Sequence, residues 1–205
     1  MVTSTSLNSG KRLGREEHRD RRRSAYHEAG HAVVAFVYGF PPYRVTIVPD
    51  NSSKGMVRIR VPQWAYQIKD SLAKCIVFTL AGIEAQNHYS RNGMALFNGG
   101  ADDSAEAGEK LNLLYELTDG VCGEFDEFEF FANCAVRQYW YAIDAFARRL
   151  LEQEVIEGQE LDDLLWTTIR NNLFEYLPVP EHLFGGYGIV PDGCTGEASL
   201  GNPKP

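Results

Sequence analysis

The chain has 205 residues, a net charge of −8 and 44% hydrophobic residues. This length fits one domain with extensions, and the hydrophobic content is sufficient for a sizeable core. The negative charge argues against a nucleic-acid-binding surface over the whole molecule. The longest apolar run, residues 75–83, is far shorter than the roughly eighteen residues that cross a bilayer, and the N-terminus lacks the apolar region of a secretory signal. We therefore expect a cytoplasmic protein without a transmembrane segment.

The N-terminal residues are polar, and we interpret residues 1–14 as a disordered leader that precedes a helix starting near Arg15. Residues 11–23 are locally basic, which indicates a solvated helix face rather than a contact with nucleic acid or anionic lipid. The cysteines show neither CxxC spacing nor clustering with histidine, so we expect buried or inert thiols; they are Cys75, Cys122, Cys134 and Cys194.

The most specific pattern is the sequence HEAGH at residues 27–31, in a segment with helical periodicity. Side chains four residues apart lie above one another on a helix, so His27 and His31 can both reach one metal ion. Glu28 is rotated away from that position and can instead hold a catalytic water. This HExxH pattern is typical of a zinc hydrolase. It favours a zinc site over a helix with two structural histidines. The helix is expected to end at Gly39.

The remaining segments predict a mainly α protein with a small β-hairpin or sheet (α+β) and HExxH on an early helix. Residues 43–48 and 56–61 have the pattern of a hairpin. Alternating apolar and basic residues in its second strand indicate an edge strand, able to align an extended peptide by strand addition. Helical periodicity follows in four segments, namely residues 68–88, 101–118, one long helix across 128–150, and 159–172. From residue 178 the chain is rich in Gly and Pro, so the expected domain covers residues 15–177 and residues 178–205 form a tail.

A catalytic zinc site normally has three protein ligands and one open position, so a third ligand is needed. Asp102 and Asp103 follow two glycines at the start of a predicted helix, where a short carboxylate can approach a neighbouring element. Glu84 and His88 on the preceding predicted helix are further candidates, but this placement favours the Asp pair, with Asp103 ahead of Asp102.

Several of these segments together resemble the peptidase domain of FtsH-type ATP-dependent zinc metalloproteases. The similar segments occur in the family's order across residues 15–170, and they are residues 25–35, 44–49 with 55–57, 80–86, 99–107, and 150–161. The resemblance implies a helical zinc-peptidase fold and a metalloendopeptidase activity with Zn²⁺ as cofactor. It places the metal ligands at His27, His31 and Asp103, with Asp102 as the one-residue alternative, and the general base at Glu28.

FtsH-type proteases also carry membrane helices and an AAA+ ATPase, for which this chain has no Walker A sequence. We therefore expect a peptidase that lacks its own ATPase module and acts on peptides or unfolded proteins, alone or with a separate AAA+ partner. A homo-oligomer is expected by analogy with the family's rings. The competing interpretations are a non-catalytic zinc-binding adaptor module and a regulatory protease with a single protein target.

Overall fold

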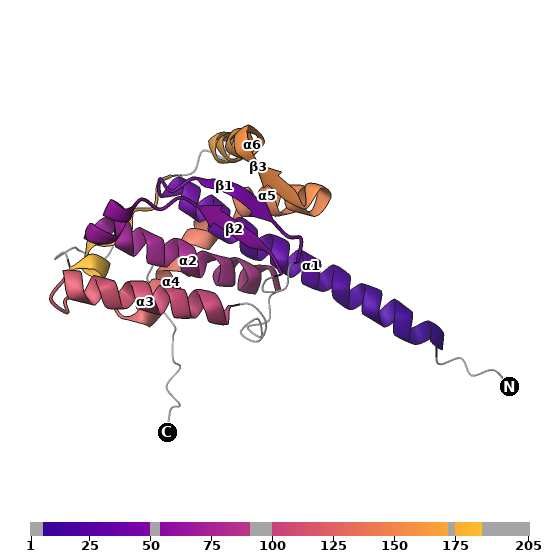
Figure 1. Ribbon diagram of the computed structural model, residues 1–205, viewed down its shortest axis with the longest axis horizontal. Helices are drawn as coiled ribbons and strands as arrows, with labels where there is room; N and C mark the ends of the chain where they lie inside the picture. The colour runs from indigo at the N-terminus through magenta and orange to yellow at the C-terminus, as the bar shows by residue number, and fades with distance from the viewer. Residues whose placement is uncertain (1–5, 50–53, 91–99, 172–174, 186–205) are drawn as a thin grey trace, which may run out of the picture.

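The computed structural model of the protein describes residues 6–49, 54–90, 100–171 and 175–185. It confirms the predicted α+β class, with helices around a small antiparallel sheet (Figure 1). The elements in chain order are α1 (Ser6–Val37), β1 (Pro42–Thr46), β2 (Met56–Ile59), the 3-10 helix η1 (Gln63–Gln67), α2 (Lys69–Ser90), α3 (Ala101–Leu117), α4 (Phe125–Gln138), α5 (Trp140–Gln153), β3 (Val155–Glu157), α6 (Gly158–Asn171) and the 3-10 helix η3 (Glu181–Phe184).

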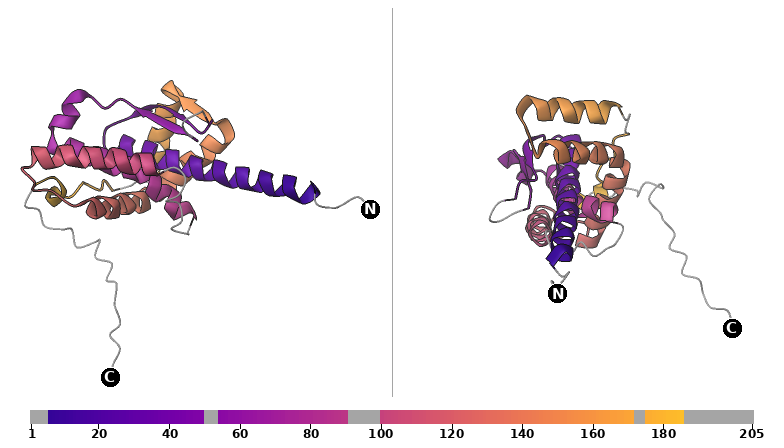
Figure 2. Two further views of the ribbon diagram at one scale, coloured as in Figure 1. Left: turned by 60° about the horizontal axis from the view of Figure 1, so that its bottom comes forward. Right: turned by 90° about the vertical axis from the view of Figure 1, so that its right-hand side faces the viewer.

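Helix α1 is longer than the sequence predicted. It begins at Ser6 and runs without a break through Ser24 to Val37, so residues 6–14 are helical rather than a disordered leader. This segment contains no proline, and each of its two glycines costs a helix only about 1 kcal/mol. The first part of α1 projects from the body of the domain (Figures 1 and 2). At the other end Gly39 takes φ +86, which closes the helix where the sequence predicted.

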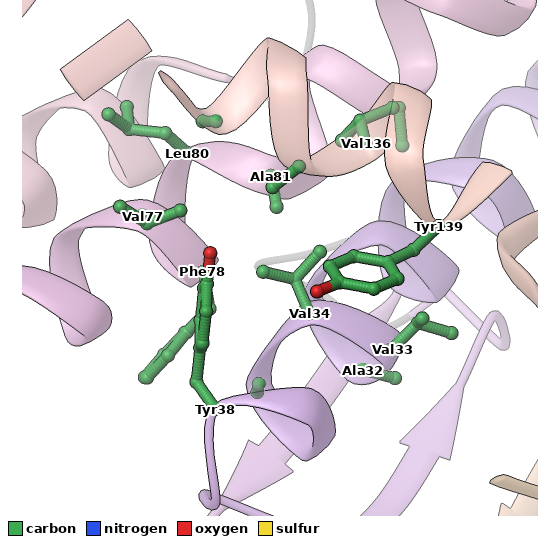
Figure 3. Close-up of a cluster of buried hydrophobic side chains, with 14 of the residues drawn as sticks. Ala32, Val33, Val34, Tyr38, Val77, Phe78, Leu80, Ala81, Val136 and Tyr139 are labelled. Carbon is green, nitrogen blue, oxygen red and sulfur yellow. The ribbon is translucent and has the colours of Figure 1, made fainter. Parts of the chain in front are cut away.

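Helices α1 and α2 form the centre of the domain and pack directly against each other. Their contact surface consists of small and branched side chains, such as Val33 and Val34 on α1 and Ala81 on α2, all buried (Figure 3). Gly30 allows the two backbones to approach closely, because a Cβ there would lie 2.4 Å from the carbonyl oxygen of Ala81. The glycine of the HEAGH sequence therefore has a packing role.

The long helix predicted across residues 128–150 is in fact two helices, α4 and α5, that meet at Tyr139. This residue leaves the helical conformation, with φ −101 and ψ 16. The break lets α4 pack mainly against α2 and α5 mainly against α1, which one straight helix would not do. The buried Tyr139 hydroxyl accepts a hydrogen bond from the Leu177 amide at 2.9 Å and thereby ties the break to the chain that follows α6.

The three-stranded sheet has the order β2-β1-β3, with antiparallel pairing on both sides of β1. The β1–β2 hairpin was predicted, and β2 is an edge strand as expected. β3 was not predicted, because it has only three residues between two helices. Val45 of β1 pairs with Val57 on one side and with Ile156 on the other, and Val45 and Ile156 are fully buried.

The packed domain also extends past the predicted boundary at residue 177. Val179 and Leu183 are buried, and η3 lies against α2. The rest of the predicted tail, including Cys194, lies outside the described residues. Cys75 is buried and Cys122 and Cys134 are partly buried, and none of the three forms a disulfide within the described residues. In the described part of the chain, every helix is too short or too polar to cross a membrane.

Candidate metal centre

The two motif histidines lie one turn apart on α1 and are both buried, at 8% and 9% exposure. Their Nε2 atoms are 3.1 Å apart. His31 is held in place from α2, because its Nδ1 lies 2.9 Å from the carbonyl oxygen of Phe78. A carbonyl oxygen only accepts hydrogen bonds, so His31 Nδ1 carries a proton and Nε2 is the ring nitrogen that faces His27.

Asp103, in the first turn of α3, completes a group of three. Its Oδ2 atom lies 2.9 Å from Nε2 of His27 and 3.5 Å from Nε2 of His31. Asp102, the adjacent carboxylate, is exposed to solvent. The fold therefore brings Asp103 and not Asp102 to the histidines, although the two residues were alternatives by sequence.

The other two candidates for a third ligand are engaged elsewhere. Glu84 accepts a hydrogen bond from the Asn133 side chain of α4 at 2.6 Å. The His88 ring packs against Trp140 of α5, with the ring centroids 4.2 Å apart. Among the described residues, His27, His31 and Asp103 are the single group of three His, Cys, Asp or Glu side chains whose donor atoms converge.

The donor set suits a zinc ion. Ligand atoms of a tetrahedral zinc with bonds of about 2.0–2.2 Å lie about 3.3–3.6 Å apart. The three distances here, 2.9, 3.1 and 3.5 Å, are close to that range. Asp103 Oδ2 is also buried without a hydrogen-bond donor in the described part of the chain. Three donor atoms of the kinds that zinc prefers thus converge in one place, and these residues fit a zinc ion.

The pKa values of Asp103 and His31 show that the carboxylate and the imidazoles stabilise each other's charged forms. Burial raises the pKa of Asp103, but the two imidazoles outweigh burial and hold it well below its usual range. Burial lowers the pKa of His31, but the Asp103 carboxylate outweighs that effect and raises it to about 9. The Asp103 carboxylate is thus stabilised as an anion, which is the form that binds a metal.

Glu28 lies beside the histidines and is buried, at 6% exposure. Burial raises its pKa above the usual range, although His27 and His31 oppose this shift. Its carboxylate packs against Gly55, where a Cβ atom would lie 2.5 Å from Glu28 Oε1. Gly55 directly precedes β2, so the edge strand begins at the Glu28 carboxylate. A buried carboxylate with a raised pKa is suited to accept and return a proton.

Gly82 on α2 is a site residue that sequence reasoning did not single out. A Cβ atom at this position would lie 2.2 Å from Nε2 of His31. The missing side chain therefore provides the space that the His31 ring occupies. The only signal in the sequence was that Gly82 lies in one of the segments that resemble the FtsH-type domain.

Comparison with known proteins agrees with this geometry. The model of peptidase family M41 matches residues 15–108, which include all three converging side chains and Glu28. The ATP-dependent zinc metalloprotease FtsH of Thermotoga maritima is 26% identical over 187 residues, in an alignment that covers 72% of this chain and 31% of the relative. The chain thus spans about a third of that relative's length. The chain is thus similar to the peptidase domain of FtsH-type proteases over residues 15–108, and this similarity supports a protein of the metallopeptidase class.

Proposed function

We propose that the protein is a zinc-dependent metalloendopeptidase. The observation that carries this proposal is the convergence of His27, His31 and Asp103 beside the buried Glu28. The three side chains would hold Zn²⁺ next to the Glu28 carboxylate. When bound, zinc supplies a Lewis acid that lowers the pKa of water and stabilises negative charge on the substrate carbonyl oxygen.

The protein's own residues then perform the proton transfers. Glu28 accepts the proton of the attacking water, and its burial keeps that proton from bulk solvent. Glu28 next donates the proton to the nitrogen of the leaving amine, which returns the carboxylate to its starting state. His31 keeps its ring orientation through the hydrogen bond from Nδ1 to Phe78.

The edge strand β2 is our candidate for aligning the substrate. It pairs with β1 on one side only, and it starts next to Glu28. An extended peptide can add to such an edge through main-chain hydrogen bonds. The proposed substrates are therefore peptides and unfolded or flexible protein segments.

The Glu28→Gln substitution tests this proposal, because it removes the base and retains the proposed ligands. We expect the variant to bind one zinc per chain, measured by metal analysis, and to lose cleavage of casein and labelled peptides. Full activity in Glu28→Gln would refute the mechanism. Zinc binding without any cleavage by the wild-type protein would instead indicate a non-catalytic zinc module.

A further inference from the structure

The edge strand β2 and the residue after it carry two arginines that the proposed mechanism does not use. Arg58 lies in β2 and Arg60 directly follows its last residue, Ile59. Both are exposed and two residues apart, so they share one face if the chain continues extended. Val57 and Ile59 alternate with them and pack against the core. The outer face of an edge next to the metal centre is thus positively charged, in a chain whose net charge is −8.

Neither arginine has a carboxylate partner in the described part of the chain. Arg58 donates to the sulfur of Met56 at 3.2 Å, and the Arg60 guanidinium lies over the Tyr43 ring, 4.8 Å from its centroid. Nearby cations differ in this respect. Arg44 of β1 forms an ion pair with Glu157 of β3, and Lys54 lies 3.3 Å from Asp20. The guanidinium groups of Arg58 and Arg60 are therefore available to an anionic partner.

The position of β2 relative to the metal centre fixes where such a partner would lie. Gly55 contacts the Glu28 carboxylate, which marks the level of the reacting bond. Arg58 follows Gly55 by three residues, or about 10 Å along an extended strand, and Arg60 follows two residues later. Directly opposed residues of paired strands point to the same face of a sheet, so a peptide paired with β2 would place its third and fifth residues from the reacting bond beside these arginines.

We propose that Arg58 and Arg60 select substrate segments with acidic side chains at the third and fifth positions from the scissile bond, on one side of it. This inference rests on the proposed peptidase function and adds a substrate class to it. The alternative role for charged residues on an edge strand is to prevent pairing between protein molecules. That role predicts no discrimination between acidic and neutral peptides.

The test uses a peptide whose cleavage site has been located by mass spectrometry. Glu, Gln or Lys is placed at the third or fifth position, before or after the scissile bond, and kcat/KM is compared within each set. We expect Glu to be preferred over Gln by about two- to fivefold at each position, the range for an exposed ion pair, and the preference to fall in high salt. The side on which the preference appears reports the direction of the bound peptide.

Variants assign the preference to individual residues. Arg58→Gln should abolish the preference for Glu over Gln at the third position, and Arg60→Gln should abolish it at the fifth. Arg58→Glu should reverse the third-position preference, so that the Lys peptide is cleaved best. Arg137→Gln is the control, because Arg137 on α4 is also exposed and has no carboxylate partner among the described residues. Its ratios should equal those of the wild type.

Failure of the inference can be separated from failure of the proposed function. Cleavage with equal kcat/KM for Glu and Gln peptides would overturn the inference and leave the peptidase assignment intact. If no peptide is cleaved, fluorescence anisotropy with the zinc-loaded protein still measures binding of the same peptides. Tighter binding of Glu peptides, with the preference reversed in Arg58→Glu, would support the selection of acidic segments by these arginines. Equal affinities for Glu and Gln peptides would overturn it.

Discussion

The Gly82→Ala substitution should abolish the metal site with a single methyl group. The added Cβ would lie 2.2 Å from Nε2 of His31, 2.5 Å from its Cε1 and 2.6 Å from its Cδ2. Non-bonded carbon and nitrogen atoms need about 3.5 Å, so the ring or the helix must move by about 1 Å. The ring has little freedom to do so, because its Nδ1 is bonded to Phe78 on the same helix α2.

A shift of this size is large for a metal ligand, since zinc–nitrogen bonds tolerate about 0.2 Å. Displacement of His31 should therefore weaken zinc binding by at least about 100-fold, at or beyond the effect of losing a residue that orients a ligand. Overpacking should also lower the free energy of unfolding of the metal-free protein by about 1–3 kcal/mol. The assays are competitive zinc titration against a chelating dye and thermal unfolding in EDTA.

Gly108→Ala is the matched control, because it adds the same methyl group to a helix. A Cβ atom at Gly108 of α3 would meet nothing within 4 Å. This variant should bind zinc like the wild type, and its stability should rise by up to about 1 kcal/mol through helix propensity. Wild-type zinc affinity in Gly82→Ala would refute the argument that this glycine makes room for the ligand.

Three further predictions concern the surroundings of the metal centre. Gly55→Ala places a Cβ 2.5 Å from Glu28 Oε1, so it should retain zinc in metal analysis while kcat falls by at least about tenfold; an unchanged kcat would count against this contact. Asp103→Ala should lose zinc affinity and the increase in melting temperature that zinc gives, whereas Asp102→Ala should keep both, and the reverse pattern in calorimetry would move the ligand by one residue. Tyr26→Phe removes the hydroxyl that donates to a carboxylate on α5, and chemical denaturation should show a loss of about 1–3 kcal/mol; wild-type stability would contradict that role.

Much of the fold followed from local patterns in the sequence. Periodicity placed α2, α3 and α6 within a few residues of their observed bounds, and alternation identified β2 as an edge strand. The break at Tyr139 was missed because the apolar stripe continues through it at helical spacing. Only the packing of α4 on α2 and of α5 on α1 requires the chain to turn there. β3 was missed because three residues are too few to establish a strand pattern.

The sequence by itself determined the pair of histidines and the glutamate between them, because residues one helical turn apart share a face whatever surrounds them. It could not choose between Asp103 and Asp102, since that choice depends on how α3 is rotated relative to α1. It also could not assign a function to Gly82 or Gly55, because a glycine that leaves space for another side chain has meaning only once the two elements are packed together. The tertiary structure decided these points: it brings the Asp103 carboxylate to the histidines, directs Glu84 toward α4, and places the two glycines against His31 and Glu28.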